Sequence, residues 1–170
     1  MKTNLNSIVL IRTLKGLTII TLSFLIISSC TGPDEKQNYN IQSEMVSLMN
    51  SLRDAAIEID AEKVMNLCLE TPEFFFFADG SVMNYDQFAK DVRDSYQNMA
   101  SHKLIWDTLY VKALSPSVAS ALAPFHQEIT QNDGAVIRLE GEVTWSATQT
   151  ENGLKLIYAH AAHRNDTTSN

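Results

Sequence analysis

The stretch Pro72-Glu73-Phe74-Phe75-Phe76-Phe77-Ala78-Asp79-Gly80 decides how the rest of the chain is interpreted. Four consecutive phenylalanines cannot form one face of an amphipathic helix, because apolar residues on such a face recur every three to four positions. The run instead predicts a strand that is buried on both faces and ends at an Asp-Gly turn. The pattern before it is helical and the pattern well after it alternates like sheet. We expect Asp79, the last polar residue of the run, to face a cavity.

The N-terminal segment resembles a bacterial lipoprotein signal. Lys2, Arg12 and Lys15 precede an apolar run, Leu17 to Ile27, that is too short to span a membrane. The run ends in Ile27-Ser28-Ser29-Cys30, which is similar to a lipobox. An ordinary signal peptide or a signal anchor with an incidental cysteine is the alternative.

The lipoprotein interpretation divides the chain into four parts. Residues 1–29 form the signal peptide, residues 30–40 the lipidated Cys30 and a flexible tether, residues 41–166 the domain, and residues 167–170 a frayed tail. Several acyl chains on one cysteine anchor a protein stably. We therefore predict a membrane partner through lipid on Cys30 and a location at the bacterial cell envelope, facing the periplasm or the cell surface.

The charge of the mature chain argues against nucleic acid as a partner. Removal of Lys2, Arg12 and Lys15 leaves 10 basic against 20 acidic residues. Binding of nucleic acid requires basic patches that neutralise phosphates. The mature chain keeps two cysteines, of which Cys30 is assigned to lipid, so Cys68 is a free thiol. We interpret Cys68 as a small core residue rather than as a nucleophile.

Three helices are predicted in the first half of the domain. Apolar residues from Ile41 to Ile59 recur at helical spacing, with Asn40 as a possible cap. Asp60 caps a second, shorter helix that Thr71-Pro72 ends. Asn84 and Gln87 have the pattern of a capping box, which opens a third helix to about Ala100.

The second half is predicted to be sheet. Alternation predicts strands over 103–114, 118–131, 135–149 and 154–163, with a brief strand at Ser81-Val82-Met83. Asn132-Asp133-Gly134 is a hairpin signal. Pro124 indicates an edge or a bulge within its strand, because proline cannot donate to a sheet ladder.

This element order resembles the nuclear transport factor 2-like superfamily, including its SnoaL-like and ketosteroid-isomerase-like members. Phe74 to Gly80 with the capped helix after it, Thr144-Trp145, and the ending Gly153-Leu154-Lys155-Leu156-Ile157-Tyr158-Ala159-His160 carry the resemblance. The resemblance implies an α+β fold: three helices packed in the concave face of a curved, mostly antiparallel sheet, with an apolar pocket. Leu154 and Tyr158 depart from the Trp and His that such endings carry, so the function transfers less readily than the fold.

The candidate site residues follow from that pocket. An acid–base enzyme of this fold would use Asp79, Tyr158 and His160, and the expected pocket wall comprises Phe77, Tyr96, Trp106 and Trp145. Asp79 is alternatively a turn residue that bonds its own backbone. His160 and His163 are three apart on a strand, so they face opposite sides and cannot chelate one metal ion. We expect no metal site and no cofactor.

Three functions remain open. The first is a lipid-anchored, non-catalytic domain that binds a small apolar ligand. The second is an isomerase, dehydratase or cyclase that uses the acid–base residues above. The third is an interaction module of an envelope assembly that forms a homodimer through the convex sheet face. The fold does not decide among them.

Overall fold

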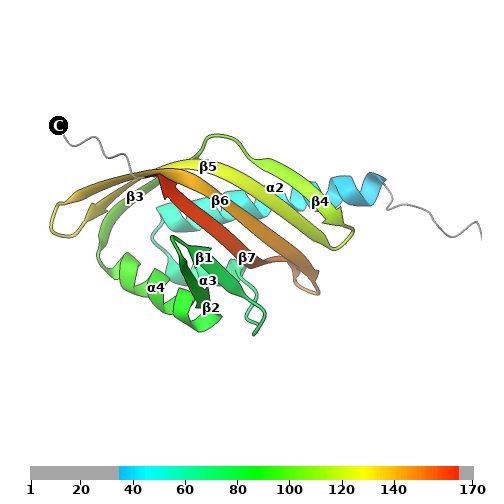
Figure 1. Cartoon of the computed structure of the whole chain (residues 1–170), viewed down its shortest axis with the longest axis horizontal. Coiled ribbons are helices and arrows are strands. Elements are labelled where there is room, and N and C mark those ends of the chain that lie inside the picture. The colour runs from blue at the N-terminus through cyan, green and yellow to red at the C-terminus, as the bar shows by residue number, and fades with distance from the viewer. Residues whose placement is uncertain (1–34, 165–170) are drawn as a thin grey trace, which may run out of the picture. The chain divides into compact units, whose positions relative to one another are not determined.

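The computed structural model describes residues 35–164, which form three helices and a seven-stranded sheet. The predicted signal peptide, the lipid attachment at Cys30 and the predicted tail at 167–170 lie outside the described residues. Figure 1 shows the helices on one side of the long, curved strands. We call the sheet face that packs against the helices the inner face and the opposite one the outer face.

The helices follow the predicted order. Their bounds are α2 Glu35–Ile57, α3 Ala61–Leu67 and α4 Tyr85–Gln97. The predicted cap at Asn40 is wrong, because α2 begins at Glu35 and Asn40 lies inside it. The other two caps are confirmed. Asp60 accepts a hydrogen bond from the Lys63 amide, and Asn84 and Gln87 form a reciprocal capping box.

Helix α2 ends in a tight turn. The amides of Ile59 and Asp60 donate to the carbonyls of Ala56 and Ala55 at 3.1 Å, the pattern of a Schellman motif. Ile59 has a φ of 55°, a left-handed conformation that favours glycine over a β-branched residue. The turn brings Asp60 directly to the start of α3, so the two helices form a bent pair.

The phenylalanine run forms one short strand, but only part of it is buried. Strand β1 covers Phe75–Ala78 and strand β2 covers Ser81–Asn84. Phe74 precedes the strand and is 1% exposed, whereas Phe75 is 43% exposed. The expectation of a strand buried on both faces is therefore wrong. The Asp79-Gly80 turn is confirmed, and both residues have positive φ, which fits the right-handed twist of a hairpin.

The remaining strands complete a mostly antiparallel sheet in the order β2-β1-β7-β6-β5-β3, with β4 also paired to β5. Their bounds are β3 Met99–Trp106, β4 Tyr110–Ser115, β5 Val118–Gln131, β6 Val136–Thr150 and β7 Gly153–Arg164. Only the pair of β1 with β7 is parallel. The predicted hairpin at residues 132–134 joins β5 to β6.

The strand predicted over 103–114 is two strands, and Pro124 explains why. Strands β3 and β4 pair with different halves of β5, and their pairings end at Phe125 and Leu122. The Pro124 carbonyl accepts from the Asp107 amide at 3.0 Å, so this side of Pro124 faces the gap between them. Because proline has no amide hydrogen, no ladder bond is lost there. The proline marks a break in the neighbouring strand rather than a sheet edge.

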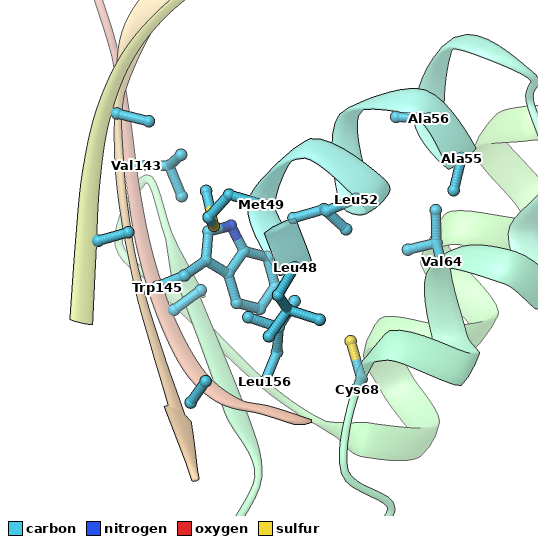
Figure 2. Packing of buried hydrophobic residues seen from close by; sticks show 14 of the residues in the cluster. Leu48, Met49, Leu52, Ala55, Ala56, Val64, Cys68, Val143, Trp145 and Leu156 are labelled. Atoms are coloured by element: carbon cyan, nitrogen blue, oxygen red, sulfur yellow. The ribbon is translucent and has the colours of Figure 1, made fainter. Parts of the chain in front are cut away.

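The core lies between α2 and the inner face. Figure 2 shows Trp145 of β6 and Leu156 of β7 directed toward Leu48, Met49 and Leu52 of α2. Trp145 and Leu156 are 4% and 0% exposed. Cys68, expected in the core, is 5% exposed. Burial raises the pKa of its thiol to about 12. The core prediction for Cys68 is confirmed.

Candidate functional site

An apolar cavity of about 230 Å³ lies between the helices and the inner face. Its wall draws on all three helices and on five strands. An engineered apolar cavity of about 150 Å³ holds benzene, so this space fits a somewhat larger ring system. The lining residues are Leu52, Val64, Phe76, Phe88, Val92, Tyr96, Leu104, Trp106, Phe125, Gln127, Val143, Trp145 and Ala161.

The wall of the cavity combines large aromatic side chains with one small residue, Ala161. Ala121, Ala123, Ala159 and Ala161 are buried on the inner face. Nearby, Gly141 lets the Phe125 ring and the β7 backbone approach closely. A Cβ at position 141 would lie 2.9 Å from Cζ of Phe125 and 2.3 Å from the Ala162 carbonyl oxygen. Side chains without a Cγ leave room that the aromatic rings border but do not fill.

Few polar groups reach this cavity. The indole nitrogen of Trp106 donates to the Met49 carbonyl at 3.3 Å, so that donor is occupied. The Tyr96 hydroxyl is protonated at neutral pH, as an ordinary tyrosine is, and burial raises its pKa further, to about 12. Oε1 of the Gln127 amide lies 3.1 Å from Nε2 of His102. The cavity is thus suited to a mostly apolar ligand with one polar contact.

A carboxylate–imidazole pair lies beside the cavity. Nδ1 of His163 lies 2.6 Å from Oδ2 of Asp79, and the His163 amide donates to Oδ1 at 3.3 Å. The hydrogen bond from the imidazole lowers the pKa of the Asp79 carboxyl. The His163 ring packs edge-on against the cavity residue Phe125, with ring centroids 5.8 Å apart. The pair therefore borders the cavity through Phe125.

The geometry of the pair fixes the tautomer of His163. Because a carboxylate only accepts, Nδ1 carries the hydrogen and Nε2 is left as the basic nitrogen. Nε2 makes no hydrogen bond within residues 39–164. Such a pair can accept a proton at Nε2 while Asp79 stabilises the resulting imidazolium.

Solved structures with this architecture are numerous. A nuclear transport factor 2-like superfamily protein from Salmonella enterica serovar Typhimurium superposes with a TM-score of 0.67 at 14% identity, covering 78% of this chain and 98% of that one. A proposed scytalone dehydratase from Novosphingobium aromaticivorans gives 0.69 at 9% identity, with coverages of 77% and 89%. A Caulobacter vibrioides protein with a cystatin-like fold gives 0.61 at 17% identity, with coverages of 73% and 89%.

The chain has the nuclear transport factor 2-like fold. No family model matches the sequence, and no curated protein matches it. The expected architecture of helices on a curved, mostly antiparallel sheet is confirmed. At these identities the likeness shows the fold and leaves the function to the residues of this chain.

Within this nuclear transport factor 2-like fold, the expected pocket residues separate. Tyr96, Trp106 and Trp145 line the cavity. Phe77 does not, because it lies on the outer face, where its ring centroid is 5.1 Å from that of His160. Its neighbour Phe76 lines the cavity and stacks on Phe88 at 4.7 Å. A register shifted by one residue exchanges the two faces of a strand.

The three expected acid–base residues do not come together. Tyr158 and His160 lie on the outer face, beside Phe75 and Phe77 of β1. The Asp79 side chain is 56% exposed and, contrary to expectation, does not line the cavity. The geometry does not support a site built from Asp79, Tyr158 and His160.

A bulge in β7 reverses the facing of its second half. Ser146 pairs with Tyr158 and the next residue, Ala147, pairs with Leu156, so Ile157 is extra. Leu154 and Leu156 are therefore inner residues before the bulge, and Ala159, Ala161 and His163 are inner residues after it. Strict alternation from Leu154 would have placed Tyr158 and His160 inside.

Sequence reasoning missed the residues that the bulge and the hairpin bring together. His163 was weighed only as a metal ligand, and Gln127 and His102 carry no motif. No sequence signal marks Ile157 as the bulged residue. Within residues 35–164, no group of three or more His, Cys, Asp or Glu side chains is arranged to hold a metal ion. None of the helices in that range is long and apolar enough to cross a membrane.

Proposed function

We propose that this domain binds a small apolar molecule in the cavity between the helices and the inner face. The single observation that carries the proposal is the cavity of about 230 Å³ with an almost wholly apolar wall. An apolar cavity of this size offers water no hydrogen-bond partners, so water does not compete with a hydrophobic ligand for the space. The volume lies below the usual range for drug-sized ligands, about 300–1,000 Å³, so a ligand with one or two fused rings fits best.

The test is a titration with camphane, a compact bicyclic hydrocarbon. The sequence has two tryptophans, Trp106 and Trp145, and both line the cavity. Their emission should therefore change in a saturable way as camphane binds.

A matched pair of variants on neighbouring residues sharpens the test. Val143 lines the cavity, whereas Thr144 faces away from it on the same strand. Val143→Phe should abolish saturable binding, because the ring occupies the ligand's space. Thr144→Phe adds the same ring to the outer face and should leave binding intact. Equal binding by both variants, with both folded by circular dichroism, would contradict the proposal.

The location at the envelope is part of the proposal. We infer that Cys30 carries lipid and holds the domain at a bacterial membrane. Full-length protein made in a bacterial host should partition into the detergent phase of Triton X-114, and Cys30→Ser should move it to the aqueous phase. Cys68→Ser, at the only other cysteine, is the control and should keep the detergent partition. If the wild-type chain partitions into the aqueous phase, the proposal that Cys30 carries lipid is contradicted.

The Asp79–His163 pair favours proton transfer as a second candidate function. The fold is shared with a protein proposed to be a scytalone dehydratase, and the pair borders the cavity through Phe125. His163 would act as the base at Nε2, and Asp79 would orient the ring. This differs from the expected role of Asp79 as the base.

A probe substrate separates the two functions. With 5-nitrobenzisoxazole, a base removes the ring C–H proton, the N–O bond breaks, and a coloured nitrile phenolate forms. If the pair is catalytic, His163→Gln should lower kcat/KM by about 10²-fold or more. His160→Gln is the control on the outer face and should change nothing. Equal rates for the wild type and His163→Gln would exclude catalysis by this pair, and ligand binding would remain as the proposed function.

A further inference from the structure

The cavity is bordered by the one buried polar residue among residues 39–164, His102. This residue lies on the inner side of β3 and is 8% exposed. Its Nδ1 lies 3.1 Å from the Ala56 carbonyl oxygen at the end of α2. Its Nε2 lies 3.1 Å from Oε1 of the Gln127 side-chain amide on β5. Both ring nitrogens are therefore engaged.

The contact with Ala56 determines that Nδ1 of the His102 ring carries a hydrogen. A carbonyl oxygen only accepts, so Nδ1 must donate to Ala56. No carboxylate within residues 39–164 lies in hydrogen-bond distance of this imidazole. A charged ring would thus be buried without a counter-ion, which is costly. In the neutral ring, Nε2 is an acceptor.

The second contact then orients the Gln127 amide. An accepting Nε2 needs a donor, and only the NH₂ end of the amide can supply one. Oε1 occupies that place in the structure, and rotation of the amide by 180° puts the NH₂ group there at little cost, because the terminal torsion of glutamine is broad. With NH₂ turned to His102, the carbonyl oxygen occupies the other position of the amide.

Gln127 itself lines the cavity. The amide atom that is turned away from His102 makes no hydrogen bond within residues 39–164. The Trp106 donor is occupied by Met49, and the Tyr96 hydroxyl can both donate and accept. The carbonyl oxygen of Gln127 is therefore the one unoccupied polar group on this wall that can only accept a hydrogen bond.

We propose that Gln127, oriented by His102, presents an acceptor to the cavity and selects ligands that carry a hydrogen-bond donor on an apolar body. Alcohols and phenols with one or two rings are the class that fits. Ketones and ethers of the same shape would set an acceptor against the Gln127 oxygen and leave both groups without a partner. This inference rests on the proposed function, because it names which small apolar molecules the cavity takes.

Three probes with one carbon skeleton test it. Borneol carries a hydroxyl, camphor carries a ketone at the same carbon, and camphane carries neither. Dissociation constants come from titrations followed by the emission of Trp106 and Trp145. Borneol should bind roughly 5–30-fold more tightly than camphor, the range that one or two kcal/mol supplies.

Variants at Gln127 assign the preference to its amide. Gln127→Leu has nearly the same volume and no hydrogen-bonding group, so it should bind borneol and camphor equally. Gln127→Met serves as a second apolar replacement if the leucine variant does not fold by circular dichroism. Gln149→Leu is the matched control, because Gln149 is an exposed glutamine of β6 away from the cavity, and it should keep the preference.

The outcomes separate this inference from the function on which it rests. If the wild type binds camphane, and binds camphor as tightly as borneol, the proposed role of Gln127 is wrong and the cavity proposal stands. A preference for borneol that survives in the Gln127 variants leads to the same conclusion. If none of the three probes binds, the cavity proposal itself fails and this inference fails with it.

Discussion

The two faces of one sheet differ most sharply between residues that are neighbours in sequence. On the inner face, Phe76, Trp145 and Ala161 line the cavity. Their neighbours Phe77, Thr144 and His160 lie on the outer face, where they pair side by side across β1, β7 and β6. The inner face borders a cavity, whereas the outer face carries aromatic and small polar side chains here and ion pairs such as Lys103–Glu128 elsewhere.

The outer face also carries a continuous row that runs nearly across the sheet. We define the outer row as the residues paired in register across β2, β1, β7, β6, β5 and β4: Val82, Phe77, His160, Thr144, Leu122 and Tyr110. Val82 and Tyr110 are 63% and 60% exposed. No acidic residue lies in this row, although the sequence carries a net charge of −7. The comparison assigns the proposed ligand binding to the inner face and the proposed association of two copies to the outer face.

The largest effect should come from removing an aromatic ring from the inner face. Trp145 is 4% exposed, so Trp145→Ala should lower the free energy of unfolding by about 3–5 kcal/mol through lost burial and a larger cavity. Thr144→Ala, one residue away on the outer face, should change it by about 0.5 kcal/mol or less. Urea unfolding measures both. Similar losses in the two variants would erase the distinction between the faces.

The buried thiol of Cys68 should make the protein unstable in alkali. Because burial raises the folded pKa of Cys68 to about 12, the unfolded chain loses this proton first as the pH rises. Stability should therefore fall above about pH 8.5, with a slope that approaches about 1.4 kcal/mol per pH unit. Urea unfolding between about pH 8.5 and 10, below the unfolded pKa of Tyr96, isolates this effect. Cys68→Ala should remove the slope, and a slope that persists in the variant would refute the assignment.

The Asp79–His163 pair should contribute less to the free energy of unfolding than Cys68 does, and it should contribute only above acidic pH. The hydrogen bond from His163 lowers the folded pKa of Asp79, so its stabilisation is present above the unfolded pKa, about 3.9. It is lost as the pH falls through the folded pKa. The carboxylate is half exposed, so about 1 kcal/mol or less is at stake. Asp79→Asn and His163→Gln should each lower stability at pH 6 and match the wild type near pH 2; a deficit that persists in acid would speak against a role of the Asp79 carboxylate in this contact.

The smallest effect on stability should come from the outer row. Leu122 is 40% exposed, so Leu122→Glu should change the free energy of unfolding by about 0.5 kcal/mol or less. If two copies associate through this row, the same substitution should shift the sedimentation coefficient from dimer to monomer at micromolar concentration. A wild-type chain that is monomeric at that concentration would remove the homodimer from consideration.

The sequence predicted the elements well because their signals are local. The caps at Asp60 and Asn84 and the turns at Asp79 and Gly134 each depend on residues within a few positions of one another. The order of such elements is what the resemblance used, so the fold could be inferred without any contact between distant residues.

The site could be predicted only in part, since it depends on which way strands face. Trp106 and Trp145 were placed by size and apolarity. Phe77 was predicted to line the cavity, but Phe76 lines it instead. Four identical residues carry no alternation that would distinguish the two faces of the strand. The bulge at Ile157 moved His163 inward, and a bulge has no local sequence rule. The contact of His102 with Gln127 joins two strands and has no signature in either.

The central claim is that the cavity is dry, open to small molecules and bounded by Trp106, Trp145 and Phe125. A crystal of the protein held under xenon gas tests it most directly, because xenon enters apolar cavities and scatters strongly. The account predicts a xenon atom in contact with these three rings. A cavity that holds ordered water instead, or one closed by the surrounding side chains, would contradict it.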